Sequence, residues 1–286
     1  MKNKLRTMFF VPGNSPKKIA KAEIYGADSI IYDLEDSVSV YEKDAARDLI
    51  SCFLQEHRPD AVIGIRINPM DTPYFEEDME CVVPLCPDFL RVPKAEKAED
   101  IIKIDEILTR KEKELGLEVG KIKIVATIET ALGVYNAFNI AKASTRVIAV
   151  GLGAEDFCAD MGMKRSENGE ELAFARNYIS LSAHAAGVMP ADYVNSNFAD
   201  EEAFLEDVRR GKQMGFAGKS CIHPNQIPLI HSVYTPTEKE IAHARDVVRV
   251  YEEAMRNASG VVALNVKMVD MPVVIRAKEL LASLEE

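Results

Sequence analysis

The sequence predicts an α/β fold in which eight parallel strands alternate with helices and close into a (β/α)8 barrel. The chain has 286 residues, and a single barrel of this class commonly takes about 250. Eight short apolar runs recur along the chain, separated by segments of helical type. Some runs are apolar throughout, as in residues 147–150, which is typical of parallel strands covered on both faces.

The expected strands cover residues 7–11, 29–34, 61–67, 89–92, 123–128, 146–150, 187–194 and 218–222. Helical patterns between them cover residues 16–25, 40–55, 97–115, 133–143, 170–186 and 200–214. A doubly wound open sheet would give the same local pattern. The barrel is favoured because the strands reach eight and because no Gly-x-Gly-x-x-Gly follows the first of them.

The chain continues well past the last expected strand. Helical patterns cover residues 237–255 and 272–284, with a short strand at 260–264 between them. We therefore expect a barrel domain over residues 1–235 and a C-terminal extension of the same domain over 236–286. Such an extension packs either on the bottom of the barrel or against a neighbouring subunit.

Composition excludes several classes of protein. A net charge of −11 repels a phosphate backbone, so nucleic acid is not an expected partner. No stretch approaches the roughly 18 apolar residues of a membrane span, and the apolar run at residues 8–11 is too short for a secretory signal. The five cysteines include no Cys-x-x-Cys, which predicts a cytoplasmic protein without disulfides or a zinc site.

Polar residues follow the expected strands at the ends that form the active-site face of a barrel. They are Glu35 and Asp36 after the second strand, Arg66 in the third, Lys94 after the fourth, Glu129 after the fifth, Glu155 and Asp156 after the sixth, and His223 after the eighth. The topology brings these side chains to one mouth, so together they predict a site.

Glu129 and Asp156 follow neighbouring strands, where two carboxylates together with water and substrate oxygens suit Mg²⁺. The alternative is that each acid caps the helix that follows it. We favour the metal for the pair. Arg66 is expected to point its guanidinium at the mouth, where it binds a carboxylate or an enolate, pairs with Glu35 or Asp36, or does both.

His223 lies in Cys-Ile-His-Pro and either binds a substrate carboxylate, transfers a proton or is structural. The other four histidines are expected to be solvated. Cys221 is expected to be a small buried side chain and not a nucleophile. The first loop opens a helix that carries three lysines, which form either an anion site for an acyl carrier or a solvated face.

At these residues the chain resembles the citrate lyase beta subunit family. The matching segments cover residues 10–14, 26–28, 33–38, 66–69, 92–94, 128–130, 153–156, 215–219, 222–224 and 267–272. The resemblance implies Mg²⁺ at Glu129 and Asp156 and substrate contacts from Arg66, Lys94, Gly153, Ala154, Glu155 and His223. It also implies a homotrimer or hexamer in which Asp270 enters a neighbouring site for proton transfer. A role for Asp270 as the N-cap of the last helix is the alternative.

The predicted reaction is retro-Claisen cleavage of a 3-hydroxy-acyl thioester, with citryl-acyl-carrier protein or citryl-CoA leading. It gives oxaloacetate and an acetyl thioester, with citrate lyase alpha and gamma subunits as possible partners. Three alternatives stay open. They are a malyl-CoA or citramalyl-CoA lyase, including the reverse condensation of malate synthesis, a lyase that acts on free 2-oxo acids, and a non-catalytic subunit that binds an acyl carrier.

Overall fold

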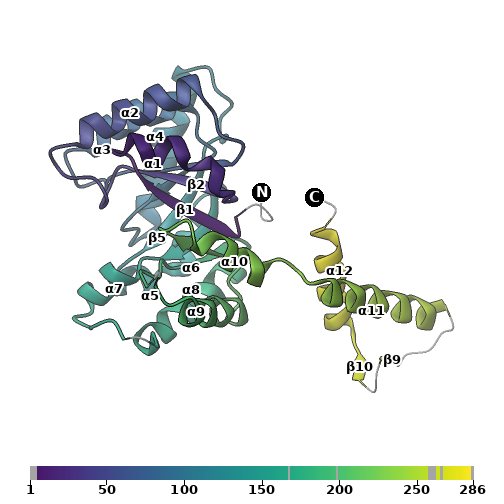
Figure 1. Ribbon diagram of the computed structural model, residues 1–286. Helices are drawn as coiled ribbons and strands as arrows, with labels where there is room; N and C mark the ends of the chain where they lie inside the picture. Colours follow the sequence, from purple (N-terminus) through teal and green to yellow (C-terminus); the bar gives the residue numbers. More distant parts are fainter. Residues whose placement is uncertain (1–4, 167, 198, 257–261, 265–266, 285–286) are drawn as a thin grey trace. The chain divides into compact units, whose positions relative to one another are not determined.

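The computed structural model describes residues 5–166, 168–197, 199–256, 262–264 and 267–284 (Figure 1). It divides the chain into two compact units, Met1–Ser232 and Val233–Glu286, and each unit is described by itself. Among the described residues, no helix combines the length and the apolar character that a membrane crossing requires.

The first unit is a closed barrel of eight parallel strands that pair in chain order, with β1 completing the circle against β8. The strands are β1 (Thr7–Pro12), β2 (Ser29–Asp33), β3 (Val62–Arg66), β4 (Phe89–Val92), β5 (Lys123–Ile128), β6 (Val147–Leu152), β7 (Met189–Asp192) and β8 (Gly218–Cys221). The predicted barrel is therefore confirmed, and each expected strand overlaps an observed one.

Helices surround the barrel (Figure 1). They are α1 (Pro16–Lys21), α2 (Lys43–Glu56), α3 (Phe75–Val82), α4 (Ala98–Glu114), α5 (Ala131–Tyr135), α6 (Ala137–Lys142), α7 (Ala154–Asp160), α8 (Ala173–Ala186), α9 (Glu201–Gln213) and α10 (Gln226–Tyr234). Short 3-10 helices lie at Glu23–Tyr25, Val83–Leu85 and Glu170–Leu172. The expected helix 133–143 is two helices that meet at Asn136, whose side-chain amide donates to the Glu96 carbonyl.

The sequence reading missed α3, α7 and α10. These helices are eight, seven and nine residues long, so each offers about two turns over which an apolar period is hard to recognise.

Apolar side chains fill the barrel interior around Met8, Phe10, Ile31, Phe89 and Val125. Phe89 occupies the space that a glycine leaves on β3, because a Cβ at Gly64 would lie 2.3 Å from its ring. Further along the strands the interior becomes polar, with buried Asp33, Arg91 and Thr127. The apolar core thus lies beneath the polar residues at the C-terminal ends of the strands.

An ion pair joins the start of β1 to the start of β2. Arg6 donates through Nε and Nη2 to the Asp28 carboxylate at 2.8 Å, and His231 Nε2 lies 3.4 Å from the same group. His231 also bonds Thr7 Oγ1 at 3.0 Å, which corrects the expectation that it is solvated. Burial alone would raise the pKa of Asp28, but hydrogen bonds from His231 and Arg6 hold it well below the ordinary value.

Replacing Asp28 with asparagine is expected to lower the free energy of unfolding by about 1–3 kcal/mol at pH 7. A depressed carboxyl pKa stabilises the fold above the unfolded-state pKa, near 4, and this contribution fades as the pH falls below it. Urea unfolding from pH 7 to pH 3 should show the difference between the two proteins beginning to narrow below about pH 4. Asp246→Asn, at an exposed ion pair with Arg249, is the control. An equal deficit at both pH values would contradict the assignment.

The second unit contains α11 (Glu238–Arg256), an antiparallel pair formed by β9 (Val262–Leu264) and β10 (Lys267–Val269), and α12 (Met271–Ala282). Its core is formed by Ala244, Val247, Val269, Val274 and Ala277. The expected strand 260–264 matches β9 where the structure describes it, and β10 was not expected. Asp270 is the N-cap of α12, where its carboxylate accepts from the Val273 amide at 3.3 Å.

Candidate active site

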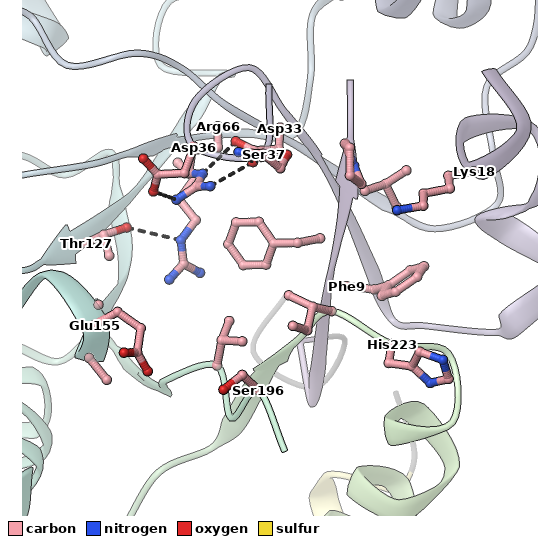
Figure 2. A pocket seen from close by; sticks show the side chains of 18 of the residues that line it. Phe9, Lys18, Asp33, Asp36, Ser37, Arg66, Thr127, Glu155, Ser196 and His223 are labelled. Carbon is pink, nitrogen blue, oxygen red and sulfur yellow. Dashed lines mark hydrogen bonds and ion pairs between the residues drawn. The ribbon is translucent and has the colours of Figure 1, made fainter. Parts of the chain in front are cut away.

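A cavity of about 840 Å³ opens where the strands of the barrel end (Figure 2). Its polar and charged lining comes from many strand ends and the loops after them, together with α1: Lys17, Lys18, Lys21, Asp33, Asp36, Ser37, Arg66, Arg91, Thr127, Glu129, Glu155, Asp156, Ser196 and His223. In Figure 2, Lys18, Phe9 and His223 lie on one side, and Asp36, Arg66, Thr127 and Glu155 lie on the other. The cavity thus has a lysine-bearing side and an acidic side.

Arg66, the last residue of β3, is held by three carboxylates. Its Nε and Nη2 donate to the two oxygens of Asp33 at 2.6 and 2.7 Å. Its Nη1 lies 2.8 Å from Glu35 Oε2 and 3.2 Å from Asp36 Oδ2, and the guanidinium lies over the ring of Phe10. The two-pronged contact with Asp33 fixes the plane of the guanidinium.

Asp33 is itself held in place. Its carboxylate accepts from the Glu35 amide at 2.9 Å and from the Ser37 amide at 3.1 Å, and the Ser37 hydroxyl donates to it as well. Burial would raise the pKa of Asp33, but Arg66 and these hydrogen bonds lower it below the ordinary value. Asp33 is therefore an ionised anchor for Arg66.

Glu35 is buried behind Arg66. Burial raises its pKa to about 8 in spite of Arg66, and the charges of Glu129, Asp36 and Asp33 add to the rise. Its Oε2 accepts no hydrogen bond from any described residue, because the nearby guanidinium nitrogen is not aligned with it. The site thus contains a buried carboxylate oxygen with unused capacity.

Glu129 follows β5 and is only 3% exposed. Its Oε2 accepts from the backbone amide of Lys94 at 3.0 Å, and Lys94 takes a positive φ of 50°, which few non-glycine residues adopt. Burial, together with the charge of Asp156, raises the pKa of Glu129 to about 7. Glu129 does not cap the next helix, because Thr130 caps α5 by accepting from the Gly133 amide.

Asp156 lies in the first turn of α7, after the N-cap residue Gly153. It raises the pKa of Glu129, so the carboxylates of the two predicted metal ligands repel each other at the cavity wall. A divalent cation would offset this repulsion. Among the described residues, no group of three or more acidic, histidine or cysteine side chains is arranged to hold a metal. Two carboxylates suit Mg²⁺, which keeps several water or substrate ligands.

The Glu129 side chain occupies the space that a side chain at position 153 would fill. A Cβ at this position would lie 2.3 Å from Glu129 Cγ and 2.6 Å from Oε1, closer than unbonded atoms approach. Gly153→Ala is therefore expected to displace the Glu129 carboxylate and to weaken Mg²⁺ binding roughly 10- to 100-fold, by analogy with the loss of a group that orients a metal ligand. Isothermal titration with Mg²⁺ measures it. Unchanged Mg²⁺ affinity in a folded variant would show that Glu129 is not a ligand.

The other predicted residues differ in placement. Ala154, Glu155 and His223 line the cavity, and Glu155 also pairs with Arg165 at 3.1 Å. The side chain of Lys94 is exposed and does not line the cavity, so Lys94 contributes through its amide. Asp270 belongs to the second unit.

Sequence reasoning did not include Asp33 or Arg91 among the site residues. Asp33 ends β2, and nothing in the sequence alone separates it from the neighbouring acids Glu35 and Asp36. Arg91 lies inside β4, and no feature of the local sequence distinguishes an inward-facing arginine of a strand from an outward-facing one.

The HpcH/HpaI aldolase/citrate lyase family model matches residues 6–224. Among curated proteins, citrate lyase subunit beta of Leuconostoc mesenteroides subsp. cremoris is 46% identical over 277 residues, which cover 96% of this chain and 92% of that protein.

Two solved structures from Mycobacterium tuberculosis are each 30% identical to the chain. The protein CitE, solved with magnesium, acetoacetate and coenzyme A, has a TM-score of 0.80 and all of both chains covered. The citrate lyase beta subunit with oxaloacetate and magnesium has a TM-score of 0.70, with 82% of this chain and 100% of that chain covered.

Proposed function

Because the chain belongs to the HpcH/HpaI aldolase/citrate lyase family, we propose that it is a carbon–carbon lyase of the citrate lyase beta subunit type. Its substrate is a citryl thioester, and its products are oxaloacetate and an acetyl thioester. The observation that carries the proposal is that Glu129, Asp156 and Arg66 line one cavity at the strand ends. A cation site can bind the hydroxyl and carboxylate oxygens of the substrate, and a fixed guanidinium can stabilise the enolate oxygen that forms on the thioester.

Glu129 and Asp156 are the residues that would hold Mg²⁺. The buried Glu129, with a pKa raised to about 7 by burial and by Asp156, is what a carboxylate site without its counter-charge would show. When bound, Mg²⁺ supplies Lewis-acid polarisation of the substrate's hydroxyl and adjacent carboxylate oxygens. The amide of Lys94 and the missing side chain of Gly153 orient Glu129 for this role.

The reaction removes one proton from the substrate, breaks one carbon–carbon bond and returns one proton to the new methyl carbon. A base removes the proton of the 3-hydroxyl, the bond between the carbinol carbon and C2 of the thioester breaks, and its electrons pass to the thioester enolate. Arg66 stabilises the enolate oxygen, while Asp33, Glu35 and Asp36 position its guanidinium. An acid then protonates the acetyl carbon. Asp270 of a neighbouring subunit in a trimer or hexamer is the proposed acid and base.

The lysine-bearing side of the cavity has the charge to bind the thioester carrier, coenzyme A or an acyl-carrier protein. Lys17, Lys18 and Lys21 of α1 line it beside Phe9, and the phosphates of a pantetheine arm are the anions that such a side attracts. His223 lies on the same side in Figure 2. We assign this side to coenzyme A or to an acyl-carrier protein, with citrate lyase alpha and gamma subunits as partners in the cytoplasm.

The test is an assay of the purified full chain with citryl-, citramalyl- and malyl-CoA in the presence of Mg²⁺. Release of the 2-oxo acid is followed by reduction with the matching dehydrogenase. Citryl-CoA is expected to give oxaloacetate with the highest kcat/KM of the three. Cleavage of malyl-CoA alone would reject the citrate assignment, and cleavage of the free hydroxy acid would show that no thioester is required.

A further inference from the structure

Arg91 forms the inner end of the cavity, within the barrel. It lies on β4 and is 3% exposed, yet it lines the cavity. Its Nε donates to Thr127 Oγ1 on β5 at 3.0 Å, the bond drawn from Thr127 in Figure 2. Its Nη1 donates to Ser220 Oγ on β8 at 3.3 Å, and the guanidinium lies 4.9 Å from the centre of the Phe10 ring. The side chain therefore crosses the barrel interior.

No carboxylate among the described residues lies within ion-pair distance of Arg91. The other buried arginines differ in this respect, because Arg47, Arg146 and Arg176 each pair with a buried acid at 2.6–3.1 Å. Burial, together with the charge of Arg66 and in spite of the charges of Glu129, Glu35 and Asp33, lowers the pKa of Arg91 to about 10, so the guanidinium is charged at neutral pH. A buried cation without a counter-ion is costly, and a bound anion would remove that cost.

The donors of Arg91 are also left available. Within the described part of the chain, Nη2 donates to no acceptor, while Nε and Nη1 bond only hydroxyl and sulfur atoms. On β6, two strands along the barrel, a Cβ at Gly151 would lie 3.2 Å from Nη2, so the absence of a side chain there leaves room beside the guanidinium. Arg66, by contrast, is already surrounded by three acids.

We propose that Arg91 determines substrate specificity by binding the carboxylate of the substrate's carboxymethyl arm, which becomes the second carboxylate of the 2-oxo dicarboxylate product. The inference rests on the proposed function. A citryl thioester differs from a citramalyl thioester in carrying this arm in place of a methyl group. The charged guanidinium of Arg91 can donate two hydrogen bonds to the carboxylate of this arm, and it makes no comparable interaction with a methyl group.

The test compares Arg91→Met and Arg91→Lys with the wild-type chain. Arg91→Met is expected to lower kcat/KM for citryl-CoA roughly 100-fold or more, the usual cost of truncating one partner of a buried charge pair, and to change citramalyl-CoA cleavage less than about threefold. Titration calorimetry with Mg²⁺ present should show the same loss of affinity for oxaloacetate and none for pyruvate. Arg91→Lys should recover part of the oxaloacetate affinity.

Thermal unfolding checks the fold of both variants. Arg91→Met leaves no carboxylate unpaired, so its Tm is expected to equal or exceed that of the wild type. Equal losses for citryl-CoA and citramalyl-CoA, or unchanged oxaloacetate affinity in Arg91→Met, would overturn the proposal. Failure of the proposed function looks different, because the wild-type chain would then leave citryl-CoA intact while the comparison of oxaloacetate with pyruvate still tests Arg91.

Discussion

Replacing Glu129 with glutamine is expected to reduce citryl-thioester cleavage by roughly 10³-fold or more and to abolish measurable Mg²⁺ binding. Glutamine keeps the shape and an oxygen that can accept from the Lys94 amide, but it lacks the charge that a hard cation requires. The variant should be at least as stable as the wild type without metal, because it removes a buried carboxylate that Asp156 repels. Steady-state kinetics and isothermal titration with Mg²⁺ measure both effects.

Glu114→Gln makes the same chemical change at the exposed last residue of α4 and is expected to leave both measurements unchanged. Retained turnover in a folded Glu129→Gln protein would show that cleavage does not depend on a metal held by Glu129.

Arg66→Met is expected to remove turnover by a comparable factor and also to destabilise the fold by roughly 3–5 kcal/mol, the usual cost of breaking a buried ion pair from one side. The loss in stability arises because the ionised Asp33 remains buried without its cation. The double variant Arg66→Met with Asp33→Asn removes the stranded charge, so it should recover part of the unfolding free energy and none of the turnover. Urea unfolding and citryl-CoA kinetics measure the two properties separately.

Two outcomes would count against this account of Arg66. If the double variant recovered turnover along with stability, the guanidinium would be structural and not catalytic. If the single variant lost turnover with no loss of stability, the three carboxylates around Arg66 would not depend on it as the distances indicate.

The barrel was predictable because its strands carry a strong, local signal. Most contain an apolar run such as residues 147–150, and polar residues separate these runs. Short helices such as α7 were not predicted because two turns carry too little periodicity. The break between α5 and α6 depends on a contact from Asn136 to Glu96, which are 40 residues apart in sequence. Tertiary contacts of this kind leave no local pattern.

The site was predictable where residues follow strands, since topology alone carries Arg66, Glu129 and Asp156 to one mouth. Two kinds of information were missing. Arg91 lies within a strand, so its inward direction depends on barrel register, and the exposed Lys94 side chain depends on a backbone turn with positive φ. Asp270 caps α12 in the second unit, and its proposed catalytic role concerns a neighbouring subunit, which no spacing within one chain can show.

The proposed function requires that Glu129 and Asp156 hold the Mg²⁺ used in cleavage. It is tested by stripping the purified chain of metal with a chelator and following oxaloacetate release from citryl-CoA as Mg²⁺ is returned, in the wild type and in Asp156→Asn. We expect no release without Mg²⁺, saturable recovery in the wild type, and little or no recovery in Asp156→Asn. Full turnover in the presence of chelator, or equal recovery in both proteins, would contradict the claim.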